Sequence, residues 1–70
     1  MQKLSKAATG RSYTIQWMFG VPEVMDFLRE HHVEEGDNIQ IIRKLKDALI
    51  VGGKGSRFAM GNEIADRIQV

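Results

Sequence analysis

The stretch Pro22 to Gly36 reads PEVMDFLREHHVEEG and contains the clearest helical pattern in the chain. Four residues fall on one helical face, at i, i+3, i+4 and i+7, with Met25 beside them: Val24, Phe27, Leu28 and His31. Pro22 suits the first helical position, because that position needs no backbone N–H. The pattern predicts a helix that begins at Val21 or Pro22, is too short to be stable alone, and lays one apolar face on a sheet.

The same stretch ends in a predicted turn. Glu35 and Gly36 suit the two central positions of a type II turn, whose second position requires positive φ and therefore favours glycine. Gly36 is accordingly interpreted as a backbone requirement of the fold.

Segments on both sides of this stretch read as strands. Residues 13–19, YTIQWMF, alternate in a period of two and predict one strand. Its core-facing side chains are expected to be Tyr13, Ile15, Trp17 and Phe19. Residues 38–45 and 48–52 predict a hairpin joined at Lys46-Asp47.

Glycines separate the remaining segments. Residues 56–60 and 67–70 read as strands, and Asn62 is expected to cap a short turn through Ala65. The count of five short strands, one helix and one terminal turn predicts a small closed or partly closed barrel.

The composition limits the classes of function. Seventy residues make a single domain, residues 1–70, which buries only about 60% of its unfolded surface. The absence of cysteine excludes disulfides, thiolate zinc sites and cysteine-ligated iron–sulfur clusters. A net charge of +1 argues against nucleic acid as a partner. Apolar runs are far shorter than the ~20 residues of a membrane helix, and the N-terminus lacks a signal core, so we expect a cytoplasmic protein.

In the order of its glycines and core aliphatic residues, the chain resembles the FeoA family of bacterial ferrous-iron uptake. The resemblance spans nearly the whole chain and rests on Leu4-Ser5, Gly10, Leu28, Val33, Gly36, Ile39, Ile41, the segment 55–60, Ala65, Ile68 and Val70. It implies an all-β fold, a small SH3-like barrel of about five strands with one short α-helix between the first and second strands. It also assigns structural roles to Gly10, Leu28, His32, Gly36, Gly55, Ala65 and Ile68.

Two residues depart from the family's pattern. His32 stands where glycine is usual at the end of the helix, so we expect positive φ at His32. Glu35 stands where proline is common. The loop at Lys46-Asp47 is also shorter than in many relatives, which disfavours a partner contact made by a long hairpin loop.

Only one cluster of the sequence has side chains suited to a metal, and it lies around the helix end. His31 and Glu35 are four residues apart and form the natural pair of ligands for Fe(II). A metal site normally needs three or more converging groups, so an ordinary solvated surface is the favoured interpretation, with no metal and no cofactor.

Three residues are candidates for contact with a protein partner: Met18, Met25 and Phe58. Methionine and aromatic residues are enriched at protein contacts. The alternative is that they pack in the core. Basic residues on the hairpins, Arg43, Lys44, Lys46, Lys54 and Arg57, are interpreted as a solvated strand face.

The resemblance implies a non-catalytic accessory protein, not an enzyme, that binds the membrane ferrous-iron permease FeoB through its cytosolic GTPase part. Such a protein would lie in the cytoplasm, at the inner face of the membrane through its partner. The alternative is an Fe(II)-responsive or regulatory SH3-like module, as found in metal-dependent repressors. Weak self-association through a strand edge stays open.

Overall fold

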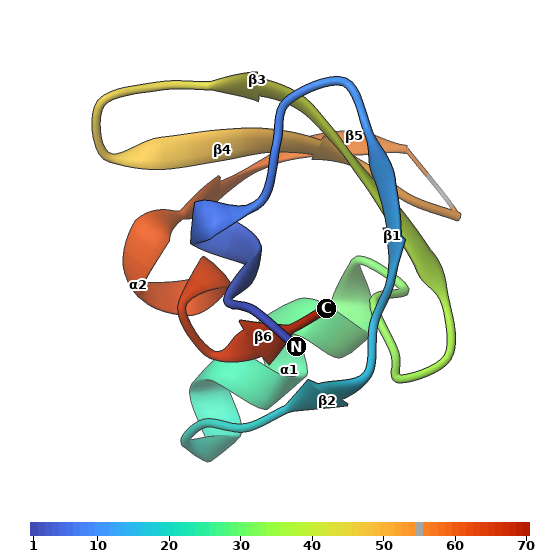
Figure 1. Ribbon diagram of the computed structural model, residues 1–70. Coiled ribbons are helices and arrows are strands. Elements are labelled where there is room, and N and C mark those ends of the chain that lie inside the picture. The colour runs from blue at the N-terminus through green and yellow to red at the C-terminus, as the bar shows by residue number, and fades with distance from the viewer. Residues whose placement is uncertain (55) are drawn as a thin grey trace.

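The computed structural model describes residues 1–54 and 56–70, which form six strands in two sheets (Figure 1). A four-stranded sheet has the order β1-β3-β4-β5, and a second sheet pairs β2 with β6. The elements in chain order are the 3-10 helix η1 (Leu4–Lys6), β1 (Ser12–Thr14), β2 (Trp17–Met18), α1 (Pro22–Glu30), β3 (Asn38–Lys44), β4 (Ala48–Gly52), β5 (Arg57–Gly61), α2 (Asn62–Ala65) and β6 (Ile68–Gln69). Neither sheet closes on itself in the described part of the chain, so the closed barrel is not formed.

The strand predicted over residues 13–19 is divided between the two sheets. β1 pairs with β3, whereas β2 pairs with β6. The change of partner falls between Ile15, whose N–H donates to the Asp37 carbonyl, and Gln16, whose N–H donates to the Gln69 carbonyl. The chain therefore has six strands, and α1 lies between β2 and β3 and not between the first and second strands.

This division also corrects the expected inward face of the segment. Ile15 is buried, but Trp17 is 50% exposed and Phe19 39% exposed. A strand that changes its pairing partner need not keep its register, and a shift of one residue reverses which side chains face the core. In β2 the side chain that packs against the core is consequently Met18.

The core lies beneath the four-stranded sheet. The buried side chains of β3 and β4 alternate with more exposed ones along each strand: Ile39, Ile41, Leu49 and Val51. In Figure 1 the curved sheet arches over the core, and α1 and the β2–β6 pair lie on the opposite side. The other buried apolar residues are Leu4, Ala7, Ile15, Leu28, Val33, Met60, Ala65 and Ile68.

The helix α1 begins at Pro22 and ends in the backbone conformation predicted at His32. His32 has φ 59° and is the one non-glycine residue with positive φ in the described chain. The N–H of His32 donates to the Arg29 carbonyl at 3.0 Å, and that of Val33 to the Leu28 carbonyl at 2.9 Å. These two bonds make a Schellman motif, in which the buried side chains of Leu28 and Val33 are the expected apolar pair.

The predicted turn at Glu35-Gly36 is confirmed. Gly36 has φ 91°, and the N–H of Asp37 donates to the Glu34 carbonyl at 3.1 Å. This turn returns the chain from α1 to the start of β3 and places Glu35 within hydrogen-bond distance of β2.

Other residues with predicted structural roles are placed as follows. Gly10 has φ 85° at the turn before β1, and Ala65 and Ile68 are fully buried. Gly55 lies outside the described residues. Asn62 is the first residue of α2, and the N-cap is Gly61 without a side-chain cap bond, so the predicted capping role of Asn62 is wrong.

The β3–β4 hairpin turns at Lys46-Asp47, where the N–H of Leu45 donates to the Ala48 carbonyl at 2.8 Å. Near both ends of the chain, Gln2 and Val70 exchange backbone hydrogen bonds beside β6. Among the helices described, none has the length and apolar character needed to cross a bilayer.

Candidate partner-binding surface

Two of the predicted contact residues, Met18 and Met25, line the same hollow. Met18 comes from β2 and Met25 from α1, and both are half-buried and pack against the core. The hollow has a volume of about 250 Å³ and is also lined by Arg29, Val33, Glu34 and Glu35. It thus combines two flexible apolar side chains with a rim of charged groups, which is the composition expected of a protein contact.

Glu35 holds one wall of this hollow in place. Its Oε2 accepts a hydrogen bond from the backbone N–H of Met18 at 3.2 Å. That N–H belongs to β2, so the carboxylate connects the turn after α1 to the neighbouring strand. The Glu35 carboxylate therefore has a structural role at the hollow, since it binds the backbone of β2.

Phe58, the third predicted contact residue, lies elsewhere. It comes from β5 and stacks on the ring of His31, with centroids 4.2 Å apart. The ring centroids of His31 and Phe27 lie 4.5 Å apart. The rings of Phe27 and Phe58 meet edge-to-face, with centroids 5.9 Å apart. Phe58 is half-buried in this cluster of three rings, which fastens α1 to β5.

The same cluster explains the position of His31. Its Nδ1 lies 2.9 Å from the Phe27 carbonyl oxygen, within hydrogen-bond distance. The two predicted ligands His31 and Glu35 therefore have separate protein partners. Over residues 1–54 and 56–70, no group of three or more His, Asp or Glu side chains is close enough to hold a metal ion.

Sequence reasoning missed an exposed aromatic pair on β2 and the loop after it. The rings of Trp17 and Phe19 lie 4.9 Å apart, and the Arg67 guanidinium lies 5.7 Å from the Phe19 centroid. Val21, two residues after Phe19 in the chain, is also 52% exposed. The alternation of residues 13–19 predicted that Trp17 and Phe19 face the core, because that pattern does not reveal where the strand changes its pairing partner.

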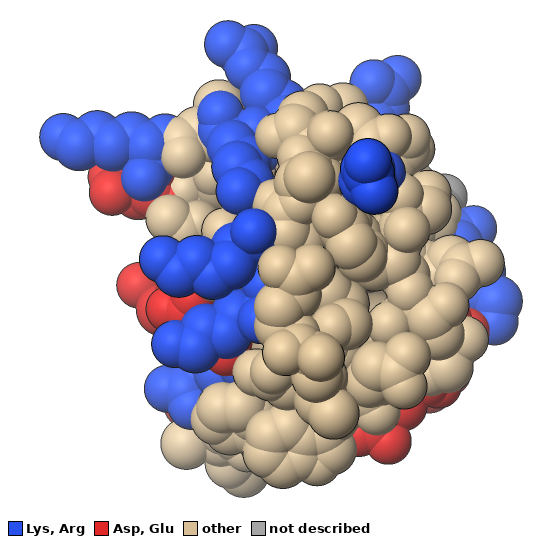
Figure 2. All heavy atoms as spheres, viewed as in Figure 1, with Lys and Arg blue, Asp and Glu red and all other residues tan. Residues whose placement is uncertain are grey.

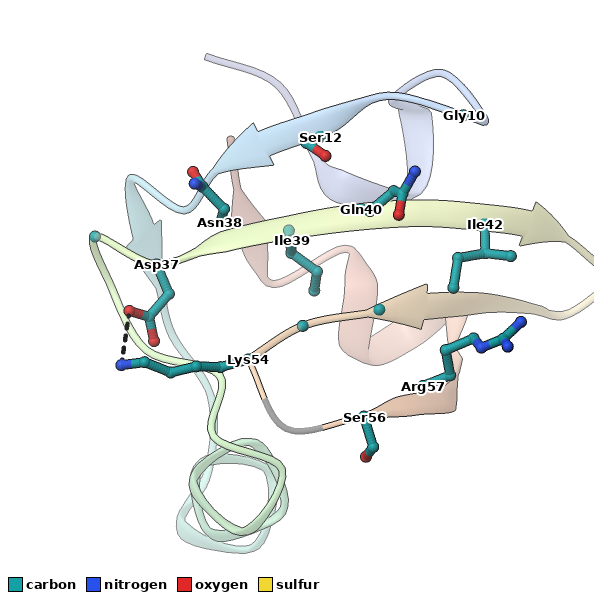
Figure 3. Close-up of a pocket in the computed structure, with 13 residues that line it drawn as sticks. Gly10, Ser12, Asp37, Asn38, Ile39, Gln40, Ile42, Lys54, Ser56 and Arg57 are labelled. Carbon is teal, nitrogen blue, oxygen red and sulfur yellow. Dashed lines mark ion pairs between the residues drawn. The ribbon is translucent and has the colours of Figure 1, made fainter.

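A larger groove lies on the outer face of the four-stranded sheet (Figure 3). Its volume is about 960 Å³. It is lined by Gly10, Ser12, Gly36, Asp37, Asn38, Ile39, Gln40, Ile42, Gly52, Gly53, Lys54, Ser56 and Arg57. The sequence marks this groove only by the pair Gly52-Gly53 beside basic residues, which were interpreted as a break between strands and a solvated strand face.

Charged side chains are unevenly placed over the molecule. In Figure 2, Lys and Arg side chains project over the β3–β4 hairpin and along the adjoining side, while the centre of the face shown is free of charge. The overall net charge of +1 is therefore the sum of separated positive and negative charges.

Comparison with known proteins identifies the family. A family model of the FeoA domain matches residues 2–70. No curated protein sequence matches the chain.

Solved structures share the fold. A crystal structure of an iron uptake regulatory protein (FeoA) is 24% identical with a TM-score of 0.84, over 94% of this chain and 89% of that one. The solution NMR structure of FeoA from Chlorobium tepidum is 21% identical with a TM-score of 0.87, over 97% and 67%. ScaR with bound Cd²⁺ is 14% identical with a TM-score of 0.85, over 97% of this chain but 33% of its own.

These structural likenesses agree with the expected SH3-like arrangement, here in two sheets, and show that it also occurs within a longer chain. The family itself is shown by the sequence match, which covers every element from η1 to β6. The chain belongs to the FeoA domain family.

Proposed function

We propose that this chain is a non-catalytic accessory protein of ferrous iron uptake that binds the cytosolic GTPase part of an FeoB-like membrane permease. The observation that carries the proposal is the FeoA domain match over residues 2–70. The crystal structure described as an iron uptake regulatory protein is a relative of the same fold. The chain would act in the cytoplasm and reach the membrane through its partner.

The hollow between α1 and β2 is the surface best suited to this contact. Met18 and Met25 present adaptable apolar side chains, and Arg29 and Glu34 provide a charged rim. Affinity would come from a few apolar contacts, as in most protein interfaces, and no residue of the chain needs to perform chemistry.

A binding assay between the chain and its cognate FeoB-like permease tests the proposal. Both the isolated cytosolic part and the full-length permease in detergent should be immobilised, so that a contact made only by the intact permease is also detected. Saturable binding to either supports the proposed function. No binding to both would overturn it.

Two substitutions test the surface. Met18→Gln and Met25→Gln keep the side-chain length but add polarity, and each should weaken binding by about tenfold or more. Val21→Gln is the matched control, because Val21 is exposed and does not line the hollow. Equal effects of all three variants would place the contact elsewhere.

A further inference from the structure

The groove on the outer face of the four-stranded sheet includes the glycine that ends β4. Gly52 lies opposite Gln40 on one neighbouring strand and opposite Arg57 on the other, and Gln40 lies opposite Ser12. Residues opposite one another in antiparallel strands point to the same face of the sheet. Gly52 thus adds no side chain to this row, and its members all line the groove of about 960 Å³: Ser12, Gln40, Gly52 and Arg57.

A bulge in β3 supplies an apolar wall to this groove. The β3–β4 register shifts between Ile41 and Arg43, which leaves Ile42 outside the regular ladder. A Cβ added to Gly52 would lie 3.0 Å from Cδ1 of Ile42, so the Ile42 side chain extends over the glycine. Figure 3 shows Ile42 and Arg57 at the same end of the groove, where an apolar group and a cation therefore lie side by side.

The charges of the groove are not balanced along its length. At one end the Lys54 ammonium pairs with Asp37 Oδ1 at 3.6 Å (Figure 3). At the other end Arg57 is exposed and forms no ion pair among the described residues. Arg43 is opposite Ile50 and is also exposed. An anionic group is thus favoured at the Arg57 end and not at the Asp37 end.

The remaining lining groups suit a peptide better than a nucleic acid. Ser12, Asn38, Gln40 and Ser56 provide neutral donors and acceptors, which match the alternating N–H and C=O groups of an extended main chain. The groove lining that is described contains no aromatic residue on which a base could stack. The net charge of +1 is likewise low for a surface that tracks phosphates.

We propose that this groove binds an extended acidic peptide segment of another protein, with a carboxylate of the segment on the Arg57 guanidinium and a small apolar side chain against Ile42. A guanidinium can accept a carboxylate through two parallel hydrogen bonds, which makes Arg57 the residue that selects the acidic side chain. The Ile42 side chain covers Gly52, so at this point the peptide would contact Ile42 and not the backbone of β4. The groove lies on the outer face of the sheet and is distinct from the hollow lined by Met18 and Met25.

The test uses ¹⁵N-labelled chain and three capped peptides of one length, in which Glu, Gln or Lys alternates with Ala and Gly. The Glu peptide should shift the backbone amides of Gly52, Gly53 and Arg57 and the side-chain amide of Gln40 in a saturable manner. Arg57→Glu should weaken this binding by about tenfold or more. Lys6→Glu changes the charge equally at an exposed residue outside the groove and is the matched control.

The amide spectrum of each variant shows directly whether it is folded, and Arg57 is exposed, so the fold should persist. The proposal is overturned by shifts that lie outside the groove, by equal binding of the Gln peptide, or by equal loss in Arg57→Glu and Lys6→Glu. It is also overturned if single-stranded oligouridine binds the groove more tightly than the Glu peptide. Because these probes are model peptides, their failure would leave binding to the permease intact, and failure of the permease assay would leave the peptide site intact.

Discussion

The backbone N–H of Val33 donates to the carbonyl of Leu28 at 2.9 Å. This bond ends α1 and spans His32, which has φ 59°. A left-handed conformation costs a side-chain-bearing residue about 1–2 kcal/mol, because its Cβ crowds the following carbonyl. The bond and the burial of Leu28 and Val33 offset this cost. The exposed imidazole of His32 is therefore carried at a position that a glycine would occupy without strain.

We expect His32→Gly to raise the free energy of unfolding by about 1 kcal/mol, since it removes the strain and no buried contact. For a chain of this size that corresponds to a rise of about 4–8 °C in Tm. Thermal and urea denaturation measure the effect. His32→Ala removes the same imidazole but keeps the Cβ, so stabilisation by His32→Ala would show that the imidazole and not the backbone is the cause.

Gly36→Ala is expected to destabilise the fold by about 1–2 kcal/mol, because Gly36 has φ 91°. A Cβ at this position would meet no atom within 4 Å, so the whole effect is due to the backbone. Gly53→Ala is the matched control, since its Cβ also meets nothing and its φ is outside the left-handed region. Equal urea midpoints for the two variants would contradict the turn assignment.

Trp17 should report an exposed environment although it belongs to a strand of aromatic and aliphatic residues. Its side chain is 50% exposed, so its fluorescence should be quenched readily by acrylamide and should shift little on unfolding. Trp17→Ala is expected to cost much less stability than Ile15→Ala, for which a loss of about 2–5 kcal/mol is typical of a buried residue. Similar losses in the two variants would indicate that Trp17 is part of the core.

His31 is expected to act as a packing residue between Phe27 and Phe58. His31→Phe should retain most of the stability, whereas His31→Ala should lose about 1 kcal/mol with the two ring contacts. Addition of Fe(II) under anaerobic conditions should leave the imidazole NMR signals of both histidines unchanged. Stabilisation by Fe(II) that disappears in His31→Phe would identify His31 as a metal ligand.

Local sequence determined the features that depend on a few neighbouring residues. The start of α1 at Pro22, the positive φ at His32 and the turn at Gly36 were all predictable, because each follows from the conformations that one residue type allows or from the family's usual glycine. The β3–β4 hairpin was also predictable, since two β-branched runs flank the short connection at Lys46-Asp47.

The surface residues depended instead on contacts between distant parts of the chain. His31 was a plausible ligand in sequence, and its stacking on Phe58 follows only once β5 lies beside α1. The grouping of Met18 with Met25 in one hollow likewise requires β2 to pass the helix. The periodicity of neighbouring residues does not predict these long-range side-chain contacts.

Taken by itself, the sequence determined the family, the mostly β character, the helix and its termination, and the identity of most core aliphatic residues. Only the tertiary structure decided that residues 13–19 divide between two sheets, that Trp17 and Phe19 face outward, and that Gln40, Gly52 and Arg57 line one groove. The physical reason is that backbone conformation and alternation are set by neighbours along the chain, whereas strand pairing and exposure are set by long-range contacts.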